Sequence, residues 1–203
     1  MISLTYDRIA PVYDILDKAY EVGWKRRLRR DVFAGLHGDI LDAGAGTGCN
    51  MPFYPAGSRV VALDASAAML RRARRRADSL GLDVDVRVGD LLATGFPDGH
   101  FDHVVATFVF CVLPEELQLP ALRELARICK PGGTVRILDY CTPKSGPARL
   151  WTRTVAPWIG FVFSARHDAG YESCVAPAGL DLVESRHVFG DVVKQLTARP
   201  VRA

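Results

Sequence analysis

Three alternating glycines directly after a short apolar run constrain this chain more than any other feature. Residues 40–50 read Ile-Leu-Asp-Ala-Gly-Ala-Gly-Thr-Gly-Cys-Asn. Glycine adopts positive φ without a steric penalty and lets the backbone approach a ligand closely, and a helix that begins at such a loop presents its first N–H groups to that ligand. We therefore expect a strand, a cofactor-binding loop at Gly44, Gly46 and Gly48, and then a helix.

A second apolar run, residues 60–63, ends in Asp64, 22 residues after Asp42. In a βαβ unit an acidic residue at about this distance binds ribose hydroxyls, which predicts a cofactor that contains adenosine. The glycine spacing disfavours two common alternatives. A dinucleotide fingerprint needs a third glycine where Cys49 stands, and a phosphate-binding P-loop needs Gly-Lys-Ser or Gly-Lys-Thr. The carboxylate of Asp42, just before the glycines, suits a ligand that carries an ammonium and a sulfonium group.

The pattern Asp-x-Gly-x-Gly-x-Gly at residues 42–48 resembles the first motif of class I S-adenosylmethionine (SAM) methyltransferases. Further motifs of that family follow in order: Gly-Asp-Leu at residues 89–91, a fourth strand at 101–107, and a turn with a fifth strand at 130–139. The resemblance covers nearly the whole chain. It implies SAM as the cofactor, S-adenosyl-L-homocysteine as the product, and a cofactor site that includes Tyr6, Asp42, Gly44, Gly46, Gly48, Asn50, Asp64, Ala65, Met69, Gly89, Asp90, Leu91 and Thr107.

Strand and helix patterns alternate as far as Asp139, which predicts an α/β fold with a doubly wound, mostly parallel sheet. Residues 179–189 and 191–198 read as two more strands, joined at Gly190 and antiparallel at one edge. The resemblance implies a Rossmann-like sheet of seven strands with an antiparallel edge strand. With 203 residues, 49% of them hydrophobic, the chain is expected to form one domain, in which residues 1–30 serve as an amphipathic lid and membrane-binding segment.

Composition and charge suggest where the protein acts. Its five cysteines form no Cys-x-x-Cys pair, so we expect neither a disulfide framework nor a zinc site, and a reducing compartment. The first residues lack the pattern of a signal peptide, and the most apolar window, residues 155–163, is far shorter than the ~20 residues of a membrane span. We expect a cytoplasmic monomer that associates peripherally with the inner face of the membrane, without a metal or a nucleic-acid partner.

Two segments outside the motifs favour contact with an anionic membrane. Residues 24–30, Trp-Lys-Arg-Arg-Leu-Arg-Arg, combine an interfacial aromatic residue with five cations, and they follow a stripe of tyrosines at helical spacing. Residues 150–163 carry further aromatic residues, with arginines on both sides. For each segment, an ordinary covering helix with a solvated polar face is the alternative.

The acceptor is less constrained than the cofactor. Residues 107–111 lack the Asp/Asn-Pro-Pro-Tyr/Phe sequence of base amino-methyltransferases, and Cys111 does not follow proline as the nucleophile of cytosine C5 enzymes usually does, so nucleic-acid substrates are disfavoured. Residues 6–14 resemble the Tyr-Asp-x-x-Ala-x-x-Tyr-Asp opening of ubiquinone/menaquinone C-methyltransferases and of one group of bacterial phosphatidylethanolamine N-methyltransferases. The short chain, the basic run and the aromatic segment favour the phospholipid enzymes. A quinone enzyme is the alternative, and a non-catalytic SAM-binding or peripheral membrane protein is an alternative of another class.

A phosphatidylethanolamine acceptor requires a neutral amine, which burial and the sulfonium charge both favour. Most of the rate would come from in-line positioning, so a dedicated general base is not required. We expect Tyr13, Tyr171 and His167 to be catalytic, since phenols can surround the amine and His167 can relay a proton or hold the phosphate. The expected substrate-binding residues are Tyr20, Tyr140, Arg149, Trp151, Arg153 and Arg166. For a quinone, His100, His103 or His167 could act as the base.

Overall fold

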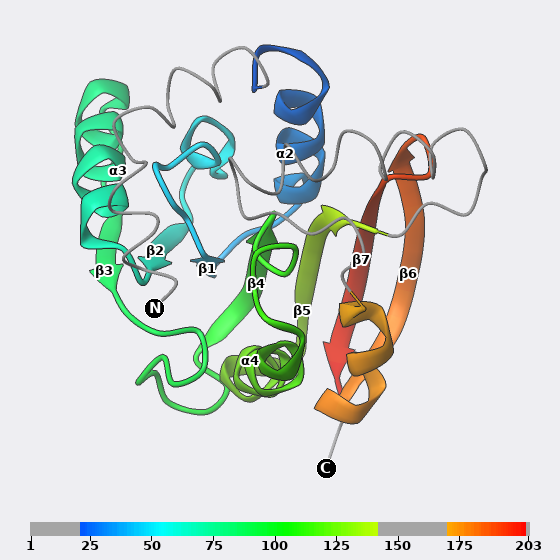
Figure 1. The fold of residues 1–203 in the computed structure, drawn as a ribbon. Helices are drawn as coiled ribbons and strands as arrows, with labels where there is room; N and C mark the ends of the chain where they lie inside the picture. The colour runs from blue at the N-terminus through cyan, green and yellow to red at the C-terminus, as the bar shows by residue number, and fades with distance from the viewer. Residues whose placement is uncertain (1–20, 142–169, 202–203) are drawn as a thin grey trace.

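The structure, a computed structural model, describes residues 21–141 and 170–201. A seven-stranded sheet forms its centre, in the order β3-β2-β1-β4-β5-β7-β6 (Figure 1). Five strands run parallel: β1 (Asp39–Ala43), β2 (Arg59–Asp64), β3 (Asp85–Val88), β4 (Phe101–Thr107) and β5 (Cys129–Tyr140). Strand β7 (Val193–Pro200) pairs antiparallel with β5 and with β6 (Leu180–Phe189). The predicted doubly wound sheet with antiparallel pairing at one edge is confirmed.

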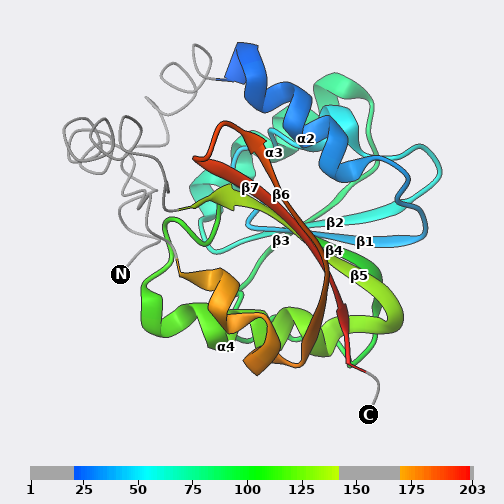
Figure 2. The ribbon, with the colours of Figure 1, turned by 90° about the vertical axis from the view of Figure 1, so that its right-hand side faces the viewer.

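Helices cover both faces of the sheet (Figure 2). One face carries α2 (Arg26–Phe33), which follows the short π-helix η1 (Glu21–Lys25), and α3 (Ala67–Leu80). The other face carries α4 (Glu115–Ile128) and the 3-10 helices η3 (Tyr171–Cys174) and η4 (Ala176–Ala178). Because α2 continues past Arg30, the expected boundary of the N-terminal segment at residue 30 falls inside a helix.

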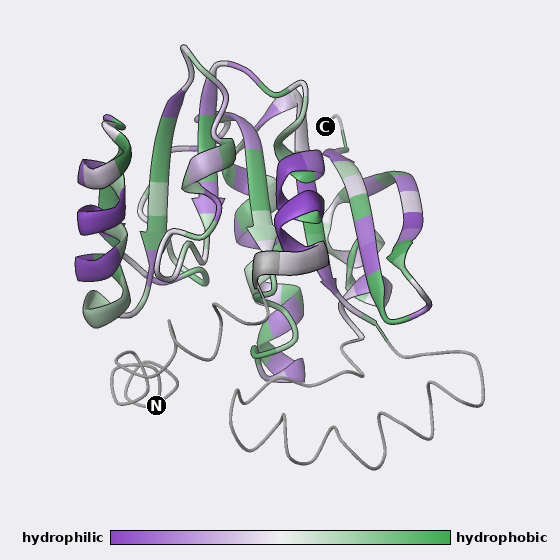
Figure 3. Ribbon diagram, turned by 90° about the horizontal axis from the view of Figure 1, so that it is seen from above, coloured by the Kyte–Doolittle hydropathy of each residue, from purple (hydrophilic) through white to green (hydrophobic). Residues whose placement is uncertain are grey.

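The central strands are rich in hydrophobic residues (Figure 3), and these residues are buried on both faces of the sheet. Successive side chains of a strand point to opposite faces, so Val104 and Ala106 pack in the core beneath α4 while Val105 packs in the core beneath α2. Burial on both faces explains why parallel strands read as continuous apolar runs. Within residues 21–141 and 170–201, no helix is both long enough and apolar enough to cross a membrane.

Two local predictions are wrong. An α-helix was expected after the glycine loop, but a single 3-10 turn, η2 (Met51–Phe53), is found there. Tyr54 is extended (ψ 132°) before Pro55, because proline disfavours a helical conformation in the residue that precedes it. The turn expected at residues 130–134 is instead part of β5, whose register with β4 shifts between Phe101 and His103.

Candidate cofactor and acceptor site

A cavity of about 580 Å³ lies at the carboxyl ends of β1, β2 and β4. The strand order reverses between β1 and β4, and ligands of doubly wound sheets bind at such a switch point. Most of the predicted cofactor residues that the structure describes line this cavity: Gly44, Gly46, Asp64, Ala65, Met69, Gly89, Asp90, Leu91 and Thr107. The apolar remainder of its wall includes Val109, Val112, Leu113 and Leu117 from the segment after β4 and the start of α4.

The glycine loop turns sharply after β1. Gly44 has φ of 76°, and a Cβ atom at this position would lie 2.4 Å from Cγ2 of Val109. The N–H groups of Gly44 and Ala45 both donate to the carbonyl of Leu63 at the end of β2, at 2.8 and 2.9 Å. A side chain at residue 44 would therefore be strained by its backbone conformation and would also clash with the cavity wall.

Asp64 is held in place by the glycine loop after β1 and by the turn that follows β2. Its Oδ2 accepts from the N–H of Gly46 at 2.9 Å, and its Oδ1 accepts from the N–H of Ser66 at 2.8 Å. A carboxylate has about four acceptor sites, so these two bonds are compatible with ribose hydroxyls as further donors. The geometry therefore suits the predicted ribose-binding role of Asp64.

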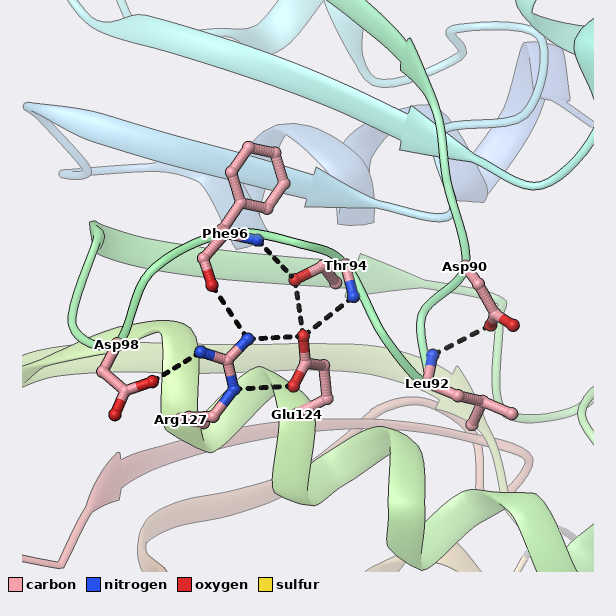
Figure 4. Close-up of polar contacts among 7 residues, drawn as sticks. All are labelled: Asp90, Leu92, Thr94, Phe96, Asp98, Glu124 and Arg127. Atoms are coloured by element: carbon pink, nitrogen blue, oxygen red, sulfur yellow. Dashed lines mark hydrogen bonds and ion pairs between the residues drawn. The ribbon is translucent and has the colours of Figure 1, made fainter.

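The segment after β3 forms the opposite end of the cavity. Asp90 Oδ1 accepts from the N–H of Leu92 at 2.9 Å, which closes a tight turn that presents Leu91 and Leu92 to the cavity. Two residues of α4 hold the chain that follows (Figure 4). Glu124 Oε1 accepts from the N–H and the hydroxyl of Thr94, at 2.8 and 2.6 Å, and Arg127 donates to the carbonyl of Phe96 at 2.9 Å.

Glu124 and Arg127 also bind each other. Arg127 donates to both carboxylate oxygens of Glu124, at 2.7 and 2.8 Å, and to Asp98. The guanidinium of Arg127, together with the bonds from Thr94, lowers the pKa of Glu124 to about 2. This charged cluster is a structural feature that the sequence analysis did not identify, and it anchors the loop that carries Asp90.

A buried polar network lies beneath the glycine loop. Asp42 is fully buried, and its carboxylate accepts from Asn50 Nδ2 at 2.8 and 3.0 Å and from the Tyr54 hydroxyl at 2.6 Å. Burial raises the pKa of Asp42 to about 6, although these hydrogen bonds oppose the shift. Asp42, Gly48 and Asn50 do not line the cavity, so the expected direct contact between Asp42 and the ligand's ammonium group is corrected to a supporting role.

Arg29 connects this network to the cavity and was not predicted as a site residue. Its Nη1 donates to Asn50 Oδ1 at 2.8 Å and to Thr107 Oγ1 at 2.7 Å, and it lines the cavity with only 7% of its surface exposed. A signal for its burial was present, because Arg29 lies on the helical stripe of Leu28, Val32 and Phe33. The expectation that all the cations of residues 25–30 face solvent or lipid is therefore wrong for Lys25 and Arg29, which are both buried.

Similarity to known proteins identifies the family. Residues 40–133 match the family model of a methyltransferase domain. The chain is 32% identical over 185 residues to the phosphatidylethanolamine N-methyltransferase of Cereibacter sphaeroides, a match that covers 90% of this chain and 89% of that protein. The chain belongs to the class I SAM-dependent methyltransferases.

This methyltransferase is also similar to a relative with a different named activity and to a solved structure. It is 36% identical over 153 residues to the demethylmenaquinone methyltransferase of Renibacterium salmoninarum, covering 73% of this chain but less than two thirds, 62%, of that protein. Geranyl diphosphate C-methyltransferase from Streptomyces coelicolor A3(2), solved with S-adenosyl-L-homocysteine, has the same fold with a TM-score of 0.70 at 20% identity, over 87% of this chain and 78% of that one.

The cofactor of the methyltransferase is SAM, and the cavity residues fit its parts. Asp64 at the end of β2 and Asp90 after β3 suit the ribose and the adenine, so the loops after β1 and β4 would hold the methionine part. Arg29 is the one cation among the described lining residues, and it would hold the methionine carboxylate. SAM supplies an electrophilic methyl group on a sulfonium.

The expected acceptor residues are largely outside the described part of the methyltransferase. This applies to Tyr6 of the cofactor set and to Tyr13, Tyr20, Arg149, Trp151, Arg153, Arg166 and His167. Tyr140 lies behind the cavity wall, with its ring 5.2 Å from that of Phe108. Tyr171 is in the core, 1% exposed and stacked on Phe110 at 5.4 Å, and it does not line the cavity.

The other candidate side chains lie away from the cavity or are unreactive. His100 and His103 are at the amino end of the sheet, before and within the first half of β4, so they are far from the carboxyl ends that form the cavity. Burial raises the pKa of the Cys111 thiol well above its ordinary value, and this protonated thiol is a poor nucleophile.

Proposed function

We propose that this methyltransferase transfers methyl groups from SAM to the amine of phosphatidylethanolamine, and to its mono- and dimethyl forms, toward phosphatidylcholine. The similarity to the Cereibacter sphaeroides enzyme carries the proposal, because it extends over 90% of this chain and 89% of that protein. The opening at residues 6–14, which resembles that of the phospholipid enzymes, supports it. On this proposal Tyr13 and His167 remain candidate acceptor residues, whereas Tyr171 would act through packing against Phe110.

The described cavity suits an acceptor that binds without a dedicated base. Its two lining carboxylates, Asp64 and Asp90, belong to the adenosine end, and the wall beyond Thr107 is apolar. An apolar wall favours the neutral form of an amine, which is the nucleophilic form. Binding and orientation by this chain would then account for most of the rate.

Methylation of a quinone ring is the second candidate. It is favoured by the relatives named demethylmenaquinone methyltransferase, among them the Renibacterium salmoninarum protein at 36% identity. Purified protein should be given labelled SAM with phosphatidylethanolamine vesicles, or with reduced demethylmenaquinone in vesicles of the same base composition. We expect label in the mono-, di- and trimethylated phospholipids on thin-layer chromatography. Label in the quinone alone would overturn the phospholipid assignment, and SAM binding without transfer to either would indicate a non-catalytic protein.

A membrane-facing surface would supply either acceptor. Arg26, Arg27 and Arg30 are exposed on α2, next to Trp24, whose ring stacks at 4.1 Å on the 41% exposed Phe189 at the tip of the β6–β7 hairpin. The hairpin tip lies at the same edge of the sheet as the carboxyl end of β5 (Figure 2). Cations beside an aromatic pair that is partly exposed suit an anionic lipid surface.

Vesicle binding tests this surface. Replacing Arg26, Arg27 and Arg30 together with Gln should weaken sedimentation with anionic vesicles, and the wild-type binding should decrease as salt increases. Replacement of Arg71, Arg74 and Arg75 of α3 with Gln is the matched control, since it removes the same charge elsewhere. Equal vesicle binding by both variants would show that α2 is an ordinary covering helix. Arg29 stays unchanged in this experiment because it belongs to the cofactor cavity.

A further inference from the structure

Strand β6 forms one edge of the sheet and is exposed on both of its faces. It is the last strand in the sheet order, and together with β7 it faces the viewer in Figure 2. Residues 181–187 are all exposed, although successive side chains of a strand point to opposite faces. Within residues 21–141 and 170–201, residues 181–188 make no backbone hydrogen bonds outside the β6–β7 ladder. The outer N–H and C=O groups of such an edge are available to a further strand.

Apolar side chains are exposed along the first half of this edge. Leu182 is 46% exposed and Val183 is 55% exposed. Val201, whose N–H donates to the carbonyl of Gly179 just before β6, is 50% exposed. An edge strand that is both unpaired and partly apolar favours pairing with another chain.

Two irregularities in β6 limit where a further strand can pair. The register of β6 with β7 shifts between Leu182 and Glu184, and again between His187 and Phe189. Between these points, residues 184–187 pair regularly with residues 194–197 of β7. A β-bulge disrupts the ladder and increases the local twist, so regular pairing with a further strand is confined to this central segment.

The central segment carries one charge of each sign on the same face of the sheet. Glu184 and Arg186 are two residues apart, with Arg186 Nε 3.5 Å from Glu184 Oε1, and their side chains are 55% and 51% exposed. In an antiparallel pair of two β6 strands related by a two-fold axis at Ser185, Glu184 of each copy lies directly opposite Arg186 of the other. An axis at Glu184 or at Arg186 would instead place like charges opposite each other, which is destabilising.

We propose that β6 is a homodimer interface, in which two copies of this chain pair antiparallel about Ser185 and join their sheets. The interface is isologous, so each Glu184–Arg186 contact between copies occurs twice. The cofactor cavity lies at the ends of β1, β2 and β4, which β5 and β7 separate from β6, so the cavities of both copies remain open. Because the strands run antiparallel, the two β6–β7 hairpin tips lie at opposite ends of the joined sheet, and one copy at a time can contact a flat membrane.

Charge substitutions test the interface. Light scattering after size-exclusion chromatography, and sedimentation velocity, should show wild type changing from monomer to dimer as its concentration rises. Arg186→Glu places carboxylates opposite each other at both contacts, so we expect the dissociation constant of the dimer to rise about tenfold. Glu184→Arg should have a similar effect. Combining Glu184→Arg with Arg186→Glu restores both opposite-charge pairs, and the dissociation constant should return to within about threefold of wild type.

Two controls separate this effect from misfolding and from net charge. Arg75→Glu makes the same charge change on α3, away from β6, and should leave the dimer unchanged. Each variant should keep the wild-type affinity for S-adenosyl-L-homocysteine, which shows that it is folded. A wild type that stays monomeric at every concentration, as the sequence analysis expects, would overturn the proposal, and so would a dimer that Arg186→Glu does not weaken. These measurements require no methyl transfer, so their outcome is independent of the proposed function.

A cysteine at the two-fold axis tests the register. Directly opposite residues of antiparallel strands have Cα atoms about 4.5–5.5 Å apart, which is within the range of a disulfide. We expect Ser185→Cys to give a covalent dimer under mild oxidation, seen on a non-reducing gel. Val183→Cys is the matched control, because the two copies of this residue would be offset by about 13 Å along the strands. Wild type controls for the five native cysteines. Cross-linking by Val183→Cys but not by Ser185→Cys would overturn the proposal.

Discussion

Replacing Arg29 with methionine tests the link between α2 and the cofactor cavity. The change removes two hydrogen bonds from Nη1, to Asn50 at 2.8 Å and to Thr107 at 2.7 Å, and it removes the one described cation of the cavity wall. Methionine is unbranched and fills space adaptably, so the contacts of α2 with the sheet should be largely retained.

The expected loss of cofactor affinity follows from the lost charge. A hydrogen bond to a charged group contributes about 1.5–3 kcal/mol, so loss of the contact with the methionine carboxylate should weaken binding by about 2 kcal/mol, roughly thirtyfold in Kd. Titration calorimetry with S-adenosyl-L-homocysteine measures this directly. Arg29→Lys should recover part of the affinity. Arg27→Met is the control, because its side chain is 78% exposed on the same helix.

The same substitution should change the pH dependence of stability. The folded-state pKa of Asp42 is about 6, above the ordinary value of 3.8, so the folded state binds more protons than the unfolded state between these values and stability falls as pH rises through that window. The guanidinium of Arg29 opposes this rise in pKa. In Arg29→Met the folded-state pKa of Asp42 should rise further, so the pH range over which stability falls extends to higher pH. In urea unfolding, the loss of stability relative to wild type should therefore be larger at pH 8 than at pH 5. A folded variant with wild-type Kd, and with a pH-independent stability difference, would refute the reasoning.

Three further predictions follow from other parts of the site. Asp64→Ala should weaken SAM binding by about 2–3 kcal/mol through lost ribose bonds, and calorimetry that gives unchanged affinity in a folded variant would remove Asp64 from the site. Gly44→Ala should destabilise the protein by about 2–4 kcal/mol in urea unfolding, from positive φ and the clash with Val109, and wild-type stability would show that the loop relaxes freely. Glu124→Gln should lower the free energy of unfolding by about 2 kcal/mol at pH 7, a value reduced because Arg127 is partly exposed. This difference from wild type should shrink as pH falls from about 4.5 toward 2, the folded-state pKa of Glu124. A difference that stays constant down to pH 3 would contradict the ion-pair origin.

Local patterns were sufficient to predict much of the fold. Strands buried on both faces read as apolar runs, so β1, β2 and β4 could be located closely, and positive-φ glycines marked the loop between them. The short 3-10 turn in place of a helix after that loop could not be predicted from the glycines alone, because Pro55 disfavours a helical conformation in Tyr54, which precedes it. Strand β7 pairs between β5 and β6, an order that depends on long-range pairing and not on the composition of either strand.

The sequence by itself determined the cofactor class. The glycine spacing sets the backbone conformation of the binding loop, and Asp64 supplies the carboxylate for the ribose, so a short segment of sequence specifies both features. Only the tertiary structure decided which charged residues line the cofactor cavity. Arg29 lies in a basic run whose members are alike in sequence, and packing of α2 against the sheet buries it beside Asn50 and Thr107 while Arg27 stays exposed. Asp42 precedes the glycines, yet the fold seals it beneath them. Burial and hydrogen-bond partners depend on residues far apart in the chain, so a local pattern can name the ligand but cannot assign each side chain its contact with it.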